Sequence, residues 1–198
     1  MTTTFSILIP TVPSRVRTFY PYILEEVVSQ IGDRKNVEVL ALLDNKKMSV
    51  GEKRNRLVDM AQGEYLAFVD DDDRISPLYV EVILEAIKNN PGVDVITFDH
   101  LLHHLQLGRN ITLRHDKDIT KCKHINDTEW RGHLAHTHVW RRNLLEGVKF
   151  IDKNFGEDMK WGLEMSGKAE SVHKISGVLY FYDFNPKTSE TNKCDFRF

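Results

Sequence analysis

Cysteine is scarce in this sequence. Its 198 residues include only Cys122 and Cys194, too few for a disulfide scaffold, which indicates a reducing compartment. Long apolar runs are also missing, since no stretch approaches the roughly 20 residues of a membrane-spanning helix. The first residues show neither the basic nor the apolar region of a secretory signal. We therefore expect a soluble, cytoplasmic protein without a transmembrane segment.

A disordered or fibrous chain is excluded by composition. Hydrophobic residues make up 41% and charged residues 28%, as in ordinary globular proteins. The length suits one domain with a buried core, and no interdomain linker interrupts it. We expect a single domain over residues 1–198.

The net charge of −2 conceals an uneven distribution. Residues 1–99 hold 11 Lys and Arg against 16 Asp and Glu, whereas residues 100–149 hold 9 against 5. Eight of the nine histidines lie between His100 and His138. An acidic first half therefore meets a basic, histidine-rich middle.

Strand and helix patterns alternate over the first half. Apolar runs predict strands at residues 5–9, 37–43, 65–69 and 93–98. Helical patterns cover residues 16–31, with Pro21 near the start, then 51–62, and a helix that begins at Ser76-Pro77 and ends near Asn90. Continuously apolar strands of this kind predict a parallel sheet with helices on both faces.

The second half is less regular. Residues 100–130 suit strands and loops, residues 139–147 and 157–167 suit helices, and residues 178–182 suit a last strand. We expect one α/β domain with an irregular C-terminal half.

Polar residues follow three of the predicted strands: Pro10-Thr11, Asp44-Asn45 and Asp70–Asp73. Ligands of an open parallel sheet bind beyond the carboxyl ends of its strands. These three segments should therefore meet at one edge of the sheet and form the site.

Four consecutive carboxylates at the end of a buried strand repel one another. A divalent cation with oxygen ligands, such as Mg²⁺, Mn²⁺ or Ca²⁺, would neutralise them. In an extended segment, Asp70 and Asp72 would point to one side and Asp71 and Asp73 to the other. The alternative is a solvated acidic loop beside a helix N-terminus.

The stretch SVGEKRNRLVDMAQGEYLAFVDDDD (residues 49–73) resembles the central block of family-2 glycosyltransferases with the GT-A fold. Its Arg-Asn pair, its Gly-Glu-Tyr strand and its aspartate cluster carry the likeness. Other segments follow the family in order: Ile7–Thr11, Glu38–Asp44, Gly156–Asp158, and Val178–Tyr182 with Ser189 and Asn192 after it. Asn45 stands where the family has a second acidic residue, and residues 100–140 have no clear counterpart.

The resemblance implies a Rossmann-like, mostly parallel sheet flanked by helices. Residues 1–99 would form the nucleotide-sugar half, and residues 100–198 the acceptor and catalytic-base half. The implied reaction is metal-dependent, inverting transfer from a nucleoside-diphosphate sugar, with a lean to UDP, to an acceptor hydroxyl on a glycan or other glycoconjugate. The implied cofactor is Mn²⁺ or Mg²⁺.

The same resemblance assigns roles to single residues. Asp72 is the first candidate metal ligand and Asp70 the second, while Asp158 is the candidate general base with Glu157 beside it. Glu157 and Asp158 would alternatively only favour a helix N-terminus. The candidate nucleotide-sugar contacts are Pro10, Thr11, Arg15, Asp44, Arg54, Asp70 and Asp71. Arg54 would either contact the nucleotide or form a salt bridge to the acidic cluster.

The histidines allow several interpretations. His133, His136 and His138 would form a metal site, joined by Cys122 and His124, although zinc-ligand spacing is absent. His100, His103 and His104 would line a cleft, or most of them would be exposed or packing residues. His173 would be a further cation ligand or an ordinary strand residue.

Two other function classes stay open. The basic, aromatic-edged stretch Trp130–Arg142 suits an anionic or sugar-bearing acceptor, and a nucleic acid acceptor is the alternative. The second open class is a module that binds nucleotide or nucleic acid without catalysis. A sugar nucleotidyltransferase is disfavoured, because residues 11–15 lack the glycines of its phosphate loop.

Overall fold

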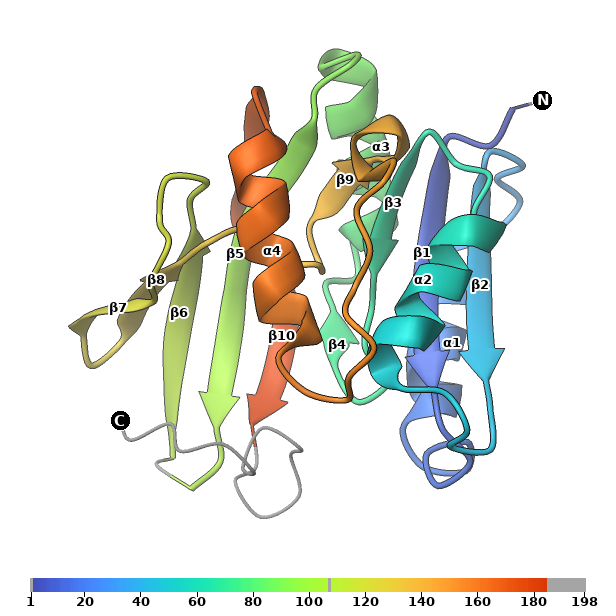
Figure 1. Cartoon of the computed structure of the whole chain (residues 1–198), viewed down its shortest axis with the longest axis horizontal. Coiled ribbons are helices and arrows are strands. Elements are labelled where there is room, and N and C mark those ends of the chain that lie inside the picture. Colours follow the sequence, from blue (N-terminus) through green and yellow to red (C-terminus); the bar gives the residue numbers. More distant parts are fainter. Residues whose placement is uncertain (1, 107, 185–198) are drawn as a thin grey trace.

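The computed structural model describes residues 2–106 and 108–184. Ser189, Asn192 and Cys194 lie outside the described residues. Within the described residues, four α-helices and a ten-stranded sheet form a layered α/β architecture (Figure 1). The α/β fold class expected from the sequence is confirmed.

Three parallel strands form one part of the sheet. β1 (Phe5–Thr11) lies between β2 (Val37–Leu43) and β3 (Tyr65–Phe68), and every residue of β1 is buried. Thr11 pairs with Leu43, and Leu8 with Phe68. The three strands therefore end at the same edge of the sheet, as predicted.

A short antiparallel strand separates β3 from the next long strand. β9 (Val139–Arg141) pairs with β3 and with β5 (Val95–His104). The helix predicted over residues 139–147 is wrong, because β9 is followed by a single 3₁₀ turn, Arg142–Leu145. Trp140 is fully buried between the neighbouring strands, and this packing outweighs local helix preference.

The helices occupy nearly the predicted positions. α1 spans Tyr20–Ile31 with Pro21 in its first turn, and α2 spans Val50–Met60. α3 spans Tyr79–Asn89, so the start predicted at Ser76-Pro77 is too early. The Ser76 amide instead donates to the carbonyl of Leu179 at 2.9 Å and continues a strand pairing. α4 spans Glu157–Lys168, as expected.

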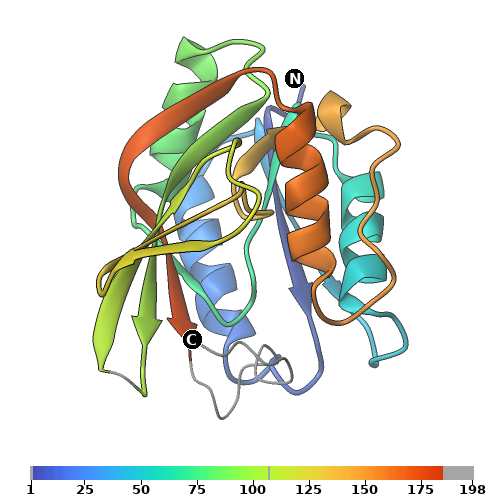
Figure 2. The ribbon, with the colours of Figure 1, turned by 60° about the vertical axis from the view of Figure 1, so that its left-hand side comes forward.

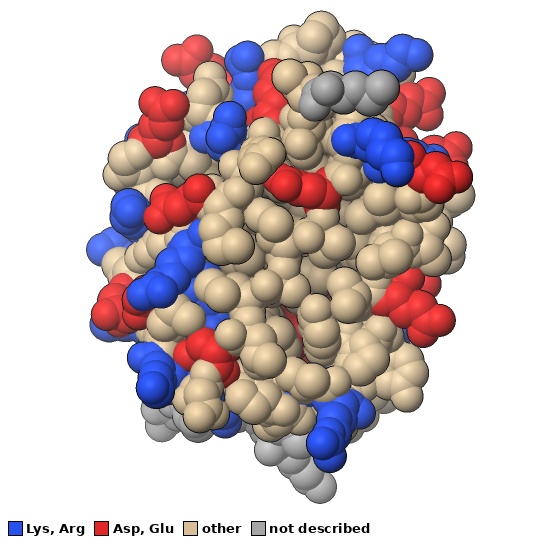
Figure 3. Space-filling model, turned by 90° about the vertical axis from the view of Figure 1, so that its right-hand side faces the viewer, with Lys and Arg blue, Asp and Glu red and all other residues tan. Residues whose placement is uncertain are grey.

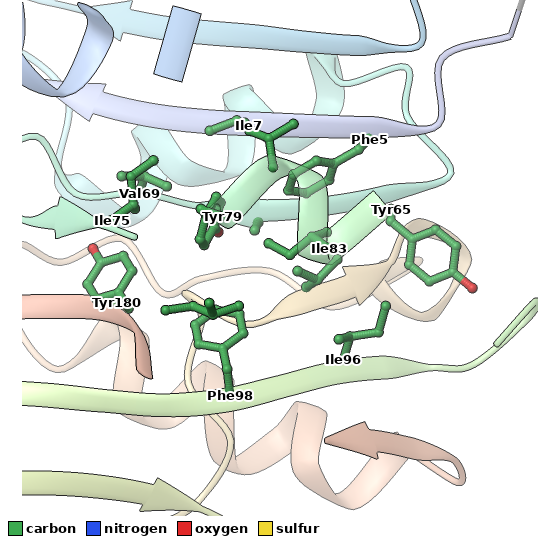
Figure 4. Close-up of a cluster of buried hydrophobic side chains, with 14 of the residues drawn as sticks. Phe5, Ile7, Tyr65, Val69, Ile75, Tyr79, Ile83, Ile96, Phe98 and Tyr180 are labelled. Atoms are coloured by element: carbon green, nitrogen blue, oxygen red, sulfur yellow. The ribbon is translucent and has the colours of Figure 1, made fainter. Parts of the chain in front are cut away.

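The helices pack in pairs on the two faces of the sheet. α1 and α3 cover one face and α2 and α4 the other (Figure 2). On the α3 face, Phe5 of β1, Tyr79 of α3 and Phe98 of β5 belong to one buried cluster (Figure 4). On the other face, Trp140 packs edge-on against Trp161 of α4, with ring centroids 5.2 Å apart. The two clusters fix the strand ends that carry the site.

The remaining strands extend the sheet beyond β5. β6 (Arg109–His115), β8 (Glu129–Gly132) and β7 (Lys123–Asn126) follow one another outward. β10 (Val172–Phe184) is parallel to β5 and antiparallel to β4 (Arg74–Ile75). The last strand predicted at residues 178–182 lies within β10.

The surface beside the edge strand β2 carries charges of both signs around a mostly uncharged centre (Figure 3). Because the signs are interspersed, this face presents no single-sign field. Among the described residues, no helix is long and apolar enough to cross a membrane.

Candidate active site

A cleft of about 550 Å³ opens at the carboxyl ends of β1 and β3. Both halves of the chain line it, and the lining includes Pro10, Thr11, Arg15, Lys53, Arg54, Asp70–Asp73, Glu157 and Asp158. A larger hollow of about 710 Å³, lined by Thr4 and Glu64 among others, lies at the amino ends of these strands. It lacks the strand-end aspartates, so we place the candidate site in the smaller cleft.

The four aspartates form a turn. The Asp73 amide donates to the carbonyl of Asp70 at 3.1 Å, and Asp71 and Asp72 occupy the turn positions. The predicted two-sided alternation of an extended segment is therefore wrong. The turn sends the carboxylates towards different partners, which spreads their charge.

Asp71 is held by the end of β1 and the turn after it. Its carboxylate accepts a hydrogen bond from the Thr11 hydroxyl at 2.6 Å and another from Arg15 at 2.6 Å. The second amino group of Arg15 lies 2.8 Å from Asp72. Arg15 therefore spans two adjacent carboxylates, and Asp71, which is 2% exposed, anchors the turn.

Asp72 is the more accessible member of the cluster. Its side chain is 32% exposed and lines the cleft. Burial, opposed by Arg15 and reinforced by Asp70 and Asp71, raises the pKa of Asp72 to about 6. The raised pKa therefore reflects burial first and the neighbouring carboxylates second, and Arg15 offsets them only in part.

Asp73 points away from Asp72 into the protein. The Tyr180 hydroxyl donates to Asp73 at 2.6 Å and accepts a hydrogen bond from the Asp70 amide at 3.0 Å. Burial, together with Asp70 and Asp72, raises the pKa of Asp73 well above its usual value. Tyr180 of β10 thus stabilises the acidic turn through hydrogen bonds to its first and last residues.

Asp70 has a partner for each carboxylate oxygen. Arg54 donates to Oδ1 at 2.8 Å, and Nε2 of His136 lies 3.3 Å from Oδ2. Burial acts to raise the pKa of Asp70, but Arg54 and His136 outweigh it, and the pKa is lowered. Each oxygen of Asp70 keeps a second lone pair beside its partner.

Arg54 joins the strand-end turn to α4. Its side chain is 5% exposed, and its Nε lies 3.4 Å from Glu157. The guanidinium also lies over the ring of Phe68, 5.0 Å from the centroid. Burial acts to lower the pKa of Arg54, but Asp70 and Glu157 raise it, so the arginine stays charged.

Asp44 differs from the other predicted site residues because it does not line the cleft. Lys53 lies 2.5 Å from its carboxylate, and the amides of Lys47 and Met48 donate to it. These hydrogen bonds, with that from Lys53 the strongest, lower the pKa of Asp44 to about 2. Lys53 also donates to the carbonyl of Thr11 at 2.6 Å, so this pair ties together the ends of β1 and β2.

Asp158 lies at the start of α4, across the cleft from the acidic turn. Gly156, with φ of 73°, lets the chain turn into the helix, and Glu157 and Asp158 occupy its first turn. The Asp158 side chain is 44% exposed, and one oxygen lies 3.9 Å from Nδ1 of His136. Asp158 is thus accessible from the cleft, while Glu157 is buried against Arg54.

The predicted metal site of His133, His136 and His138 does not form. His136 is buried behind the cleft, against Asp70 and Asp158 of its lining. His138 instead packs with His100 and His115, and the ligand atoms of these three all lie within 4.8 Å of one another. Cys122 is exposed, and His124 stacks on Trp130. His173 pairs with Ile96 at the start of β10 and does not line the cleft.

Hydrogen bonds fix most of the ring protons of His100, His115 and His138, of which His115 is half-buried and the other two are buried. His115 Nδ1 faces the carbonyl of His133 at 2.6 Å and must carry a proton, so its Nε2 accepts from Nδ1 of His100 at 3.2 Å. His138 Nδ1 accepts from the Ala135 amide, which leaves its proton on Nε2. That Nε2–H has no hydrogen-bond partner among the described residues, and Nε2 of His100 faces the Thr137 hydroxyl at 3.3 Å. Because the ring nitrogens do not present a set of free lone pairs, we assign no metal to this cluster.

Three site residues were missed or misplaced in the sequence analysis: Lys53, His136 and Tyr180. Lys53 stands beside Arg54 in the block that resembles the family, so the sequence held a signal for it. His136 and Tyr180 reach Asp70 from 66 and 110 residues away along the chain. No local pattern reveals contacts of that range.

Comparison with known proteins decides the family. Residues 21–146 match the sequence family described as "Glycosyl transferase family 2". The chain belongs to this family. The family match covers the acidic turn, Arg54 and His136, and it ends before Asp158.

The curated relatives of the chain are distant. The chain is 26% identical over 146 residues to an uncharacterized glycosyltransferase, EpsJ, of Bacillus subtilis, covering 68% of this chain and 42% of the relative. It is 23% identical over 131 residues to an uncharacterized glycosyltransferase, MJ1057, of Methanocaldococcus jannaschii, covering 65% and 44%. The chain thus spans less than half the length of these relatives.

Solved structures confirm the GT-A fold. TarS of S. aureus, residues 1–349 in complex with UDP-GlcNAc, superposes with a TM-score of 0.65 at 17% identity, covering 92% of this chain and 59% of TarS. Glucosyl-3-phosphoglycerate synthase of Mycobacterium tuberculosis, in complex with Mg²⁺ and UDP, gives 0.59 at 14%, covering 93% and 73%. At such identities the likeness concerns the fold alone.

Proposed function

We propose that this family 2 chain catalyses metal-dependent, inverting transfer of a sugar from a UDP-sugar to an acceptor hydroxyl on a glycan or other glycoconjugate. One observation carries the proposal: Asp72 and Asp158, from different halves of the chain, open into the same cleft. A cation-binding carboxylate and a free carboxylate in one cleft are what such a displacement requires.

The donor side of the cleft suits a nucleoside diphosphate. The partly exposed carboxylate of Asp72 adjoins two further acidic residues, and oxygen donors of this kind fit Mg²⁺ or Mn²⁺. Asp72 would hold the cation directly, and Asp70 would act through its hydrogen bonds or through water. A bound cation would offset the charge that develops on the departing diphosphate.

The strand ends would hold the remainder of the nucleotide. Pro10 and Thr11 line the cleft at the end of β1, and Arg15 lies beside them. Asp44 would act near the nucleobase, because its ion pair with Lys53 fixes the loop after β2. A UDP donor and a divalent cation are also supported by the UDP, Mg²⁺ and Mn²⁺ bound in the structural neighbours.

Asp158 would serve as the general base. A hydroxyl is a poor nucleophile, and a positioned carboxylate that takes its proton promotes attack on the anomeric carbon. Attack from the face opposite the leaving diphosphate inverts that carbon. The exposure of Asp158 to the cleft leaves it accessible to an acceptor, whereas Glu157 is occupied by Arg54.

The basic middle segment gives less support to a nucleic acid acceptor. Arg109 pairs with Asp127 at 3.2 Å, and Arg114 and Arg131 both pair with Glu129. Because local carboxylates offset these arginines, the segment presents fewer free cations than its composition suggests. A neutral sugar-bearing acceptor fits this surface better.

The proposal is tested by thermal shift and calorimetry with UDP-sugars, with and without Mn²⁺. We expect Mn²⁺-dependent binding of UDP, weakened at least about tenfold by Asp72→Ala because the cation loses its ligand. Asp33→Ala, an exposed aspartate outside the cleft, is the matched control and should bind as wild type does. Unchanged binding in Asp72→Ala would remove this residue from the metal site.

A further inference from the structure

His136 lies in a loop that is fixed at several points. The loop joins β8 to β9, and the Leu134 amide donates to the Ser166 hydroxyl of α4 at 3.1 Å. The Trp140 indole donates to the carbonyl of Ala135 at 3.0 Å. The His136 side chain is 10% exposed, and its ring packs at a tilt against Phe68, with 6.1 Å between ring centroids. Its position is therefore set by the surrounding core.

Two carboxylates of the proposed reaction lie on opposite sides of this ring. Nε2 is 3.3 Å from Asp70 at the end of β3, and Nδ1 is 3.9 Å from Asp158 at the start of α4. These are the donor-side carboxylate and the candidate base. His136 thus lies between groups that the sequence places 88 residues apart.

Arg54 makes the matching connection on the other side. It binds the second oxygen of Asp70 at 2.8 Å and Glu157, the neighbour of Asp158, at 3.4 Å. The strand end and the helix start are therefore linked twice, once by a guanidinium and once by an imidazole. Glu157 is held by Arg54, while the second oxygen of Asp158 faces His136.

We propose that His136 is a positioning residue that holds Asp158 at a fixed separation from Asp70. This inference rests on the proposed function, because it concerns how the base is aligned with the donor. Asp158 is nearly half exposed, and its other oxygen accepts only a local bond from the Met159 amide. His136 limits the orientations of this carboxylate, so the acceptor proton is taken where the sugar is bound.

The experiment compares three variants with wild type. His136→Phe keeps a ring against Phe68 but removes both nitrogens, and His136→Gln restores one polar donor. Thr137→Val is the control, since Thr137 is equally buried in the same loop and contacts His100 instead of a carboxylate. Calorimetry gives the affinity for UDP with Mn²⁺, and a panel of nucleoside-diphosphate sugars gives kcat and KM.

A positioning role predicts that kcat falls about 10- to 100-fold in His136→Phe, while the UDP affinity stays within about threefold of wild type. His136→Gln should lie between these values. Thr137→Val should melt at a lower temperature with kcat nearly unchanged, which separates positioning from stability.

Several outcomes would overturn the assignment. A wild-type kcat in His136→Phe would show that the ring does not align Asp158. A loss of UDP affinity as large as the loss of kcat would show that the ring contributes to donor binding instead. If His136→Gln is as inactive as Asp158→Asn, the histidine itself is the base. If wild type turns over no donor, the proposed function fails and this inference fails with it.

Discussion

One buried arginine stabilises carboxylates on both sides of the acidic cleft. Arg54 neutralises Asp70 and Glu157, which come from different halves of the chain. Without it, the buried carboxylate of Glu157 would lose its cationic partner, and the partly buried Asp70 would keep only His136. The cost of leaving such charges uncompensated is far larger than the gain from an exposed ion pair.

We therefore expect Arg54→Ala to lower the free energy of unfolding by about 3–5 kcal/mol at pH 7. The matched control is Arg56→Ala, in the same helix. Arg56 forms an exposed pair with Glu52, and its loss should cost about 0.5 kcal/mol or less. Urea denaturation measures both, and equal losses would contradict the role given to Arg54.

The buried histidines produce a pH effect of defined sign. Burial, reinforced by His115 and His138, lowers the pKa of His100 well below its usual value, and burial lowers the pKa of His115 to about 4. In the unfolded chain these rings take up a proton below about pH 6.5. The unfolded state then binds more protons, so these groups reduce stability as the pH falls from about 6.5 towards 4.

The variant His100→Phe tests this effect. Asp72 acts in the opposite direction over the same range, since its pKa is raised to about 6, so the difference between variant and wild type is the informative quantity. Between pH 7 and pH 5, wild type should lose about 1–2 kcal/mol more stability than His100→Phe. Parallel pH profiles from chemical denaturation would show that His100 takes up its proton equally in both states.

At the scale of elements, the contact between α2 and the segment before α4 keeps Arg54 near Glu157. Gly51 in the first turn of α2 lies so close to the carbonyl of Ile151 that a Cβ atom would overlap with it. Its amide also donates to the carbonyl of Lys153 at 3.0 Å. Only glycine permits this approach.

We expect Gly51→Ala to destabilise the protein by about 1–3 kcal/mol through overpacking, despite the better helix propensity of alanine. Gly167→Ala, in the exposed last turn of α4 where a Cβ meets open space, should instead stabilise by about 0.5–1 kcal/mol. Thermal unfolding distinguishes the two. A stabilised Gly51→Ala would show that the two segments separate readily.

Sequence patterns predicted the elements whose burial is continuous. β1 and β3 are buried at every position, and α4 begins at acidic residues after a glycine. β9 was missed because a strand of three residues is too short to show an alternating pattern. It is a strand because Trp140 pairs with β3 on one side and with β5 on the other, and both partners are distant in sequence. The alternating orientation predicted for Asp70–Asp73 was wrong because the extended backbone ends with β3, at Phe68.

Over the whole molecule, the site arises where two halves of the chain meet. Of the predicted site residues, Pro10, Thr11, Arg15, Arg54, Asp70, Asp71, Asp72 and Asp158 line one cleft. Their positions directly after predicted strands indicated a common site for most of them, because the carboxyl ends of parallel strands lie at the same edge of the sheet. His136 and Tyr180 could not be assigned from sequence, since only the closed fold brings β10 and the β8–β9 loop to the aspartates.

The most direct test of the central claim is the effect of Asp158→Asn on binding and transfer, measured in one preparation. The account predicts Mn²⁺-dependent UDP affinity within about threefold of wild type and a transfer rate reduced about 100- to 10,000-fold, as for loss of a general base. Transfer at the wild-type rate by Asp158→Asn would contradict it.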